Sequence, residues 1–546
     1  MRQPLPLLAA VAAFVLGGLT DPALAQGSDD SYGRPAVGSV DDTPSDNFIG
    51  RWLTGAEDED AAASDKSGEN AIPARLTRKE MQAKRPRTLA ILRGSDHGLV
   101  ANDKLQKYVN EVMQEVMDAA GYSDLPVQVH ILATPEFRAA AYPDGSIYVS
   151  IGMLWDLKYE DELAFLLSHE LSHVLLRHYE SDWLEDFENK VFVSANLLGS
   201  FADKFGELTG KTEAAEKIRK VSRIAKIAYE VTDNALSPAW TREQEASADE
   251  MGVDLMIKAG FDGSAVDLVM DLFDDEEKRR KAAYAEARRQ AELAAQEDAS
   301  KETNVWNAAM SVFGNGLGWA VKDLKNEFGN NYYQIDKRRL AVIQHFEKKY
   351  PNYSPERDSK LLPWRLNEDE FLKSDQVAIV LDHYEKAYKA SKEMELGNFE
   401  KAEILLREAI KAPTKRDAFV RYVFYQLRSE QKQERYADLN LKYAKEGKEV
   451  SYPIFEALID RALEKNDYKL ALDHVSDAQS RLGDPPRLLP KRIRIYAQLG
   501  NAKEMQALLL QCQYDFPNLA TKCKKAAGEA SDSHSMKQKM LKKAIN

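Results

Sequence analysis

The stretch DELAFLLSHELSHVLLRH, Asp161–His178, decides how this chain folds around its chemistry. Its residues are apolar around nearly the whole circumference of a helix, which predicts a helix buried inside a domain. His169 and His173 lie four residues apart, so their imidazoles leave such a helix on one side, one turn apart. Two imidazoles in that arrangement can bind one zinc ion, and Glu170 between them can take a proton from a metal-bound water. The stretch therefore predicts a zinc site that hydrolyses peptide bonds.

The third ligand is expected from a separate helix, in the segment TREQEASAD at residues 241–249. Glu245 and Asp249 lie one turn apart on one face of that helix. We expect Glu245 to bind zinc, and Asp249 to hold the other ring nitrogen of a zinc-binding histidine and fix its orientation. Glu243 is the competing ligand, and acidic pairs at this spacing are also common on solvated helices.

His178 is a less suitable ligand than Glu245. Nine residues after His169, it faces away from that histidine on a straight helix. Metzincins place a third histidine about ten residues along, after a glycine that ends the helix, and no glycine stands here. We therefore expect His178 to support the site or the structure rather than to bind the metal.

The spacing of apolar residues changes ahead of the buried helix. Residues 127–132 (VQVHIL) and 146–151 (SIYVSI) alternate as strands do, and Pro143-Asp144-Gly145 gives a turn before the second strand. Together with the helices, these strands predict an α+β, zincin-like domain that is mainly α with a small β-sheet.

Length and charge restrict the class of protein. At 546 residues the chain is too long to fold around a single hydrophobic core, so two or three domains are expected. Hydrophobic residues at 44% and charged residues at 30% are typical of a soluble, helix-rich protein. The formal net charge of −13 argues against a nucleic-acid-binding protein, which needs a basic surface for phosphates.

The N-terminus has the pattern of a secretory signal peptide. A basic second residue, an apolar run over residues 5–19 and the small-residue site Ala23-Leu24-Ala25 meet its requirements. The alternative, a membrane anchor that stays attached, is disfavoured because the run is short for a spanning helix. We therefore expect an exported, soluble mature protein.

The C-terminal third carries a repeated pattern, GNFEKA, KNDYKLA and GNAKEM. Its asparagines, Asn398, Asn466 and Asn501, are 68 and 35 residues apart. These spacings match two periods and one period of tetratricopeptide repeats, which are about 34 residues long. We predict an α-solenoid of such repeats that binds other proteins, with unrelated helical hairpins as the alternative.

The two cysteines, Cys512 and Cys523, lie in this exported context. On one straight helix they would be too far apart to bond, but Pro517 should end the helix between them. A helical hairpin would bring them together. We predict a disulfide, with two free thiols as the alternative.

These patterns divide the chain into six segments. They are a signal peptide (1–25), a disordered acidic linker (26–77), a zinc metalloprotease domain (78–350, with a helical insertion at about 262–330), a linker (351–375), a tetratricopeptide-repeat domain (376–520) and a Lys-rich tail (521–546). Residues 305–321, rich in Trp and Gly, are expected to form a packed hairpin. A mobile flap or a peripheral contact with the membrane is the alternative for that segment.

The motif His169–His173 followed by Glu245–Asp249 resembles the HtpX and CAAX-prenyl-protease family of zinc peptidases. Residues 141–149 resemble that family's edge strand. The signal peptide and C-terminal repeats make the chain similar to the periplasmic, BepA-type proteases of the family, which act in outer-membrane protein quality control.

The resemblance implies a zinc metalloendopeptidase with one Zn²⁺ ion per chain, acting on unfolded or misassembled proteins in the periplasm. Its partners would be protein substrates and, through the repeats, envelope or outer-membrane assembly proteins. A substrate would lie extended along the sheet edge as an added strand. The residues expected to form that edge are Ser146, Ile147, Tyr148, Val149, Ser150 and Ile151.

Two positions depart from the family pattern. Arg138-Ala139 stands where the family often has Asn-Ala on the edge strand. Tyr333-Gln334 stands where a His-Pro pair usually comes six residues before an Arg-Leu, here Arg339-Leu340. Tyr333 is therefore a candidate catalytic residue that donates a hydrogen bond to a zinc-bound oxygen or to the tetrahedral oxyanion, with a packing aromatic as the alternative.

Two other functions compete with proteolysis. The first is a periplasmic chaperone or assembly adaptor that binds through its repeats and has a latent protease site. The second is a zinc hydrolase that acts on another bond, which the expected edge strand beside the helix disfavours.

Overall fold

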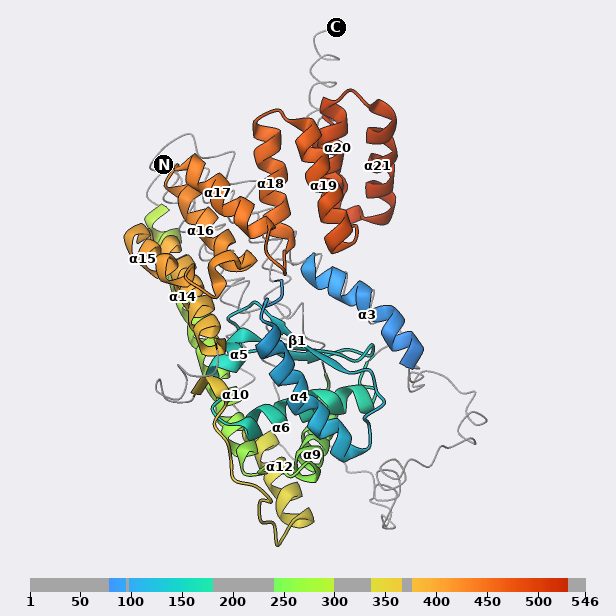
Figure 1. Ribbon diagram of the computed structural model, residues 1–546, viewed down its shortest axis with the longest axis vertical. Coiled ribbons are helices and arrows are strands. Elements are labelled where there is room, and N and C mark those ends of the chain that lie inside the picture. Colours follow the sequence, from blue (N-terminus) through green and yellow to red (C-terminus); the bar gives the residue numbers. More distant parts are fainter. Residues whose placement is uncertain (1–77, 95–97, 180–239, 299–334, 366–375, 529–546) are drawn as a thin grey trace, which may run out of the picture.

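The computed structural model describes residues 78–94, 98–179, 240–298, 335–365 and 376–528 (Figure 1). The expected signal peptide, the acidic linker, residues 305–321 and Tyr333 lie outside these residues. The described part is mainly helical with one small sheet, as the sequence predicts. In it, no helix is both long enough and apolar enough to cross a membrane.

The N-terminal part, residues 78–365, consists of helices packed around a three-stranded sheet. Its elements are α3 (Arg78–Arg93), α4 (Asp103–Ala120), β1 (Gln128–Leu132), β2 (Ala139–Ala141), β3 (Ser146–Ser150), α5 (Ile151–Asp156), α6 (Glu160–Leu175), α9 (Arg242–Lys258), α10 (Ala265–Asp298), α12 (Ile335–Lys349) and the short 3₁₀ helix Pro363–Arg365.

The strand order is β1-β3-β2, so β3 is the central strand. It pairs in parallel with β1 on one side and antiparallel with β2 on the other. The expectation that residues 146–151 form the open edge is therefore wrong, and Ile151 already begins α5. The error arose because β2 is only three alanines, which have weak strand propensity and no alternating pattern.

The two faces of the sheet pack against different elements. Ile147 and Val149 of β3 belong to the core that includes α4 and α6. Tyr148 points the other way and packs in a separate cluster with Leu92 of α3 and Leu132 of β1. Alternation along β3 therefore buries both faces, and α6 lies beneath the sheet as a fully internal helix.

The C-terminal part consists of successive pairs of helices (Figure 1). They are α14 (Val377–Glu395), α15 (Phe399–Ala409), α16 (Ala418–Glu430), α17 (Glu434–Lys445), α18 (Tyr452–Glu464), α19 (Tyr468–Leu482), α20 (Leu488–Gln498), α21 (Ala502–Asp515) and α22 (Ala520–Ala526). The second helices of the pairs begin at residues 399, 434, 468 and 502, which are 34 or 35 residues apart. Each asparagine of the repeated sequence pattern lies just ahead of one of these starts.

The two parts share one hydrophobic core, because its buried residues continue from α4 and α6 into α14, α15 and α16. The indole Nε1 of Trp155 donates to the carbonyl of Leu381 on α14, at 3.2 Å. On the opposite side, Arg93 of α3 forms an ion pair with Glu449, with Nε 2.9 Å from Oε2. The helical pairs are therefore packed onto the N-terminal part rather than tethered to it.

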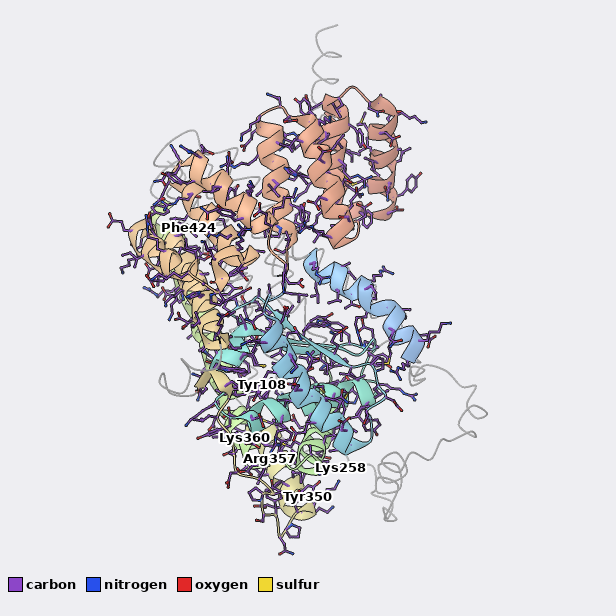
Figure 2. The ribbon with its side chains drawn as sticks, viewed as in Figure 1. Tyr108, Lys258, Tyr350, Arg357, Lys360 and Phe424 are labelled. Carbon is purple, nitrogen blue, oxygen red and sulfur yellow. A yellow bond between two sulfur atoms is a disulfide. The ribbon has the colours of Figure 1, made fainter. Side chains whose placement is uncertain are left out.

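Residues 351–365, expected as part of a linker, pack against the N-terminal part. The indole of Trp364 donates to the carbonyl of Leu154 at 3.0 Å. Arg357 and Lys360 (Figure 2) approach Glu160 at the start of α6, at 3.4 and 3.8 Å. This segment thus adds positive charge beside the acidic first turn of α6.

Cys512 and Cys523 form a disulfide, which confirms the prediction from their spacing. Helix α21 ends at Asp515, the 3₁₀ turn Pro517–Leu519 reverses the chain, and α22 returns the second cysteine. Both cysteines are buried. The start of the expected Lys-rich tail is consequently an ordered helix packed against α20 and α21.

Candidate metal centre

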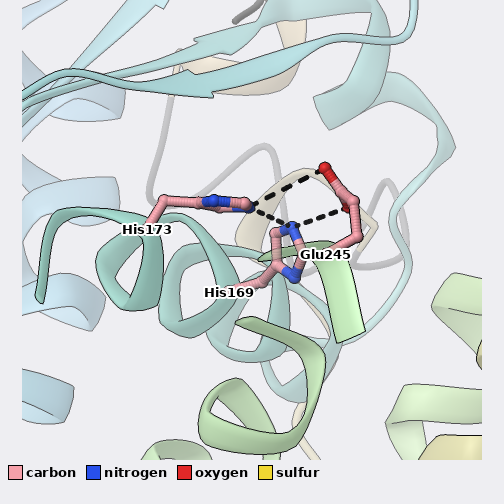
Figure 3. Close-up of side chains that lie close together, drawn as sticks. All are labelled: His169, His173 and Glu245. Carbon is pink, nitrogen blue, oxygen red and sulfur yellow. Dashed lines mark hydrogen bonds and ion pairs between the residues drawn. The ribbon is translucent and has the colours of Figure 1, made fainter. Parts of the chain in front are cut away.

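His169, His173 and Glu245 converge on one point (Figure 3). Their ligand atoms lie within 4.8 Å of one another, and no other group of three potential metal ligands occurs among the described residues. Nε2 of His169 is 3.1 Å from Nε2 of His173 and 3.6 Å from Oε2 of Glu245. Nε2 of His173 is 3.9 Å from Oε1 of Glu245. The structure thus brings together the three ligands that the sequence predicts.

Local structure explains the convergence. The spacing of four residues places both histidines on one side of α6, as expected for an α-helix. Glu245 lies in the first turn of α9, which begins at a capping box formed by Thr241 and Gln244. Gly252 allows α9 to approach α6 closely, because a Cβ atom there would lie 3.1 Å from the backbone N and Cα of His169.

The side chains fit a zinc ion. Two imidazole nitrogens and a carboxylate form a donor set that zinc prefers in catalytic sites, with a further coordination position for water or substrate. Burial lowers the pKa of His173 well below its usual value, so its ring is neutral and can offer a lone pair to a metal. The two Nε2 atoms face each other at 3.1 Å, where a cation between them and Glu245 would satisfy all three groups.

Glu170 is buried beside these ligands. Its Oε2 atom has no hydrogen-bond partner in the described part of the chain. Burial raises the pKa of this carboxyl to about 7, with a further increase from the charge of Glu245 and an opposing effect of His169. A carboxyl with a pKa near neutrality is suited to accept and return a proton.

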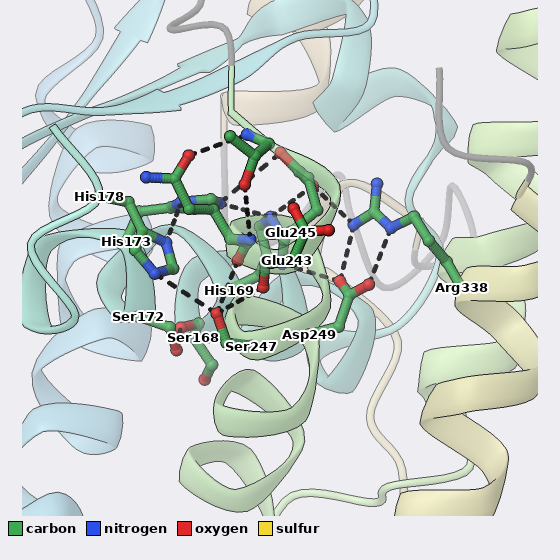
Figure 4. Close-up of polar contacts among 12 residues, drawn as sticks. Ser168, His169, Ser172, His173, His178, Glu243, Glu245, Ser247, Asp249 and Arg338 are labelled. Carbon is green, nitrogen blue, oxygen red and sulfur yellow. Dashed lines mark hydrogen bonds and ion pairs between the residues drawn. The ribbon is translucent and has the colours of Figure 1, made fainter. Parts of the chain in front are cut away.

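Asp249 holds His169 as the sequence predicts, with Oδ1 2.9 Å from Nδ1 of the ring. Sequence reasoning missed Arg338 of α12 (Figure 4). Its Nε and Nη2 donate to Oδ2 and Oδ1 of Asp249 at 2.8 and 2.7 Å, and Nη2 is also 3.0 Å from Oε2 of Glu245. Burial alone would raise the pKa of Asp249, but Arg338 and His169 lower it to about 2.

His178 stays outside the ligand group, as expected, although for a different reason. Helix α6 ends at Leu175, and Arg177 adopts a left-handed conformation with φ of 59°, so the chain turns back. Nδ1 of His178 then lies 3.0 Å from Nδ1 of His173 (Figure 4). A straight helix was the wrong assumption, because no glycine signals the turn.

Trp240 is a second residue that the sequence did not reveal. Its ring stacks on the imidazole of His173, with centroids 4.5 Å apart and an angle of 15° between the planes. Trp240 stands just before Thr241, the N-cap of the helix that carries Glu245, but nothing in the sequence connects it with His173.

The remaining candidates do not join the group. Glu243 has an exposed side chain and is not among the converging ligands, so Glu245 is the better placed of the two. Residues 146–151 lie in the centre of the sheet and at the start of α5 rather than at an edge.

Comparisons with known proteins agree with this geometry. Residues 103–317 match the model of peptidase family M48. The mitochondrial metalloendopeptidase OMA1 of Schizosaccharomyces pombe is 27% identical over 178 residues, which cover 33% of this chain and 47% of that protein.

Two bacterial relatives match a similar share of this chain. The putative beta-barrel assembly-enhancing protease of Vibrio cholerae is 25% identical over 31% of this chain and 32% of its own length. The beta-barrel assembly-enhancing protease of Escherichia coli O157:H7 is 23% identical over 32% of this chain and 34% of its own length. The chain thus spans about a third to a half of the length of these relatives. The match to peptidase family M48 over residues 103–317 thus includes His169, Glu170, His173, Glu245 and Asp249, and leaves out only Arg338 of the residues described above at the centre.

Proposed function

We propose that this protein is an exported, zinc-dependent metalloendopeptidase that cleaves unfolded or misassembled proteins of the cell envelope. The observation that carries the proposal is the convergence of His169, His173 and Glu245 beside the buried carboxyl of Glu170, whose Oε2 has no hydrogen-bond partner among the described residues. The family match over the same residues supports a peptidase reaction.

His169, His173 and Glu245 would hold the zinc ion, and a bound ion would supply Lewis acidity for a water molecule and a peptide carbonyl. Glu170 would accept the proton of the attacking water and return it to the leaving amine. Its pKa of about 7 suits both transfers near neutral pH.

The substrate would bind along β2, which replaces the edge expected from the sequence. β2 is an outer strand of the sheet and packs against α6. Arg138 and Tyr142, which flank it, make their backbone hydrogen bonds to β3. In an antiparallel pair, the backbone groups of Ala139 and Ala141 then point away from β3. A peptide added there would be recognised mainly through its backbone, which suits unfolded chains of varied sequence.

The helical pairs would dock partners as tetratricopeptide repeats. Starts of second helices 34 or 35 residues apart support this assignment, since that is the expected period. The bacterial relatives are named as β-barrel assembly-enhancing proteases, which favours envelope or outer-membrane assembly proteins as partners. The signal-peptide pattern favours the periplasm over the mitochondrion named for OMA1.

Glu170→Gln tests the proposal. The variant should retain one zinc ion per chain, because the three ligands remain, and should lose cleavage of an unfolded protein such as casein. His169→Ala should lose both zinc and cleavage. Zinc content is measured on the purified mature chain by elemental analysis.

The alternative function, a chaperone or assembly adaptor, has its own expected outcome. If Glu170→Gln fully restores envelope function in a deletion strain, proteolysis is not the physiological activity. A wild-type chain that binds no zinc would remove the metallopeptidase proposal altogether.

A further inference from the structure

We propose that His178 and Ser247 form a hydrogen-bonded chain that fixes the tautomer and orientation of the His173 ring. The inference rests on the proposed function, because it assumes that His173 binds the metal through Nε2. His178 is thus a positioning residue, and it acts on the metal only through His173.

The direction of each hydrogen bond follows from the number of protons available. Ser247 Oγ lies 2.8 Å from the backbone carbonyl of Glu243 and 3.1 Å from that of Gln244; both can only accept, so the single hydroxyl proton points to these carbonyls. Nε2 of His178, 3.4 Å from Oγ, must then be the donor. A neutral imidazole has one N–H, so Nδ1 of His178 carries a lone pair.

That lone pair faces His173. Nδ1 of His178 is 3.0 Å from Nδ1 of His173, which must therefore carry its proton on Nδ1. The Nε2 atom of His173 is left with a free lone pair, and this atom faces His169 and Glu245. The chain of bonds thus selects the tautomer that a metal ligand needs, starting from a backbone carbonyl that cannot change its role.

The fold builds this chain from two helices. The backbone N–H of His178 donates to the backbone carbonyl of His173 at 3.0 Å. The backbone N–H of Arg177 donates to the backbone carbonyl of Val174 at 3.3 Å. This pattern returns His178 to the end of α6. Ser247 comes from α9, one turn after Glu243. His178 is only 8% exposed, so water does not compete freely for its nitrogens.

The two histidines of the site therefore have different supports. The carboxylate of Asp249, which is paired with Arg338, holds His169. A neutral histidine and a serine hold His173. Loss of the neutral chain should weaken metal binding without leaving a buried charge unpaired.

Zinc affinity of the full mature chain, measured by chelator competition, tests the inference. His178→Leu removes both nitrogens at similar volume and should weaken zinc binding by about 10- to 100-fold. His178→Asn places an amide oxygen near the position of Nδ1 and should recover most of that loss. Ser247→Ala should weaken binding by a smaller factor. The absorption spectrum of the cobalt-substituted protein should change in His178→Leu and return toward wild type in His178→Asn.

His130→Leu is the matched control, since His130 is also 8% exposed but belongs to the sheet. Its zinc affinity should equal that of the wild type. Zinc affinity of His178→Leu within twofold of the wild type, while His169→Ala abolishes binding, would overturn the inference and leave the proposed function intact. If His178→Leu does not fold, Ser247→Ala decides, and an unchanged affinity there overturns the inference. A wild-type chain without zinc affinity would overturn both.

Discussion

Arg338 clasps Asp249 through two parallel hydrogen bonds of 2.7 and 2.8 Å, across 89 positions of sequence. The same guanidinium reaches Glu245, so one cation pairs with both the candidate metal ligand Glu245 and the carboxylate of Asp249, which contacts His169. Its side chain is only 11% exposed. The pair therefore joins α12 to α9 and orients His169 at the same time.

Arg338→Ala should lower the free energy of unfolding by about 3 kcal/mol or more, because it leaves the buried Asp249 carboxylate without its cation. Zinc affinity should fall as well, since Asp249 and Glu245 lose their common anchor. Chemical denaturation and chelator competition measure the two effects. The neighbouring Arg339→Ala is the control: its ion pairs with Asp267 and Asp271 involve exposed carboxylates and should contribute at most about 1 kcal/mol. Equal losses for the two variants would contradict this role of Arg338.

His130 should make the protein less stable in acid. Burial, with smaller contributions from Arg85 and Arg93, lowers its pKa from 6.5 to about 4. The unfolded chain therefore binds a proton more readily, so the contribution of His130 is complete above pH 6.5 and is lost as the pH falls toward about 4. The loss is at most about 3 kcal/mol. Unfolding free energies of wild type and His130→Leu at pH 7.5 and pH 4.5 should diverge accordingly. A parallel decline of both proteins would disprove the assignment.

Gly252→Ala should separate α9 from α6. The added Cβ would lie 3.1 Å from the backbone of His169, closer than ordinary contact, so one helix must shift. We expect a loss of about 1–3 kcal/mol in stability and weaker zinc binding, because Glu245 moves with α9. Thermal melting of the metal-free chain and zinc titration measure both quantities. Unchanged melting and unchanged affinity would show that the helix pair relaxes without cost.

Removal of the disulfide should affect stability and leave the metal centre intact. Cys512→Ser/Cys523→Ser opens a loop of 11 residues, which corresponds to about 3 kcal/mol in the chain-entropy model. The loss should be confined to α20, α21 and α22, whose core contains both cysteines. Hydrogen exchange of this region should increase in the variant, while zinc content stays at the wild-type value. A drop in zinc content would indicate that the C-terminal helices support the site.

The sequence by itself determined the features that depend on local geometry. A helix sets the direction of neighbouring side chains through its regular backbone, so spacings of four residues were sufficient for His169 with His173 and for Glu245 with Asp249. The repeated sequence pattern indicated where second helices of the pairs begin, and Pro517 indicated the turn between the two cysteines.

Only the tertiary structure decided which distant groups meet. Arg338 reaches Asp249 because α12 packs on α9, and β3 became the central strand because three alanines pair with it. His178 lies against His173 because Arg177 adopts a left-handed backbone conformation, and the sequence has no glycine there to indicate the turn. Such outcomes depend on the burial and pairing of segments far apart in the chain, where many arrangements satisfy the local pattern and packing selects one.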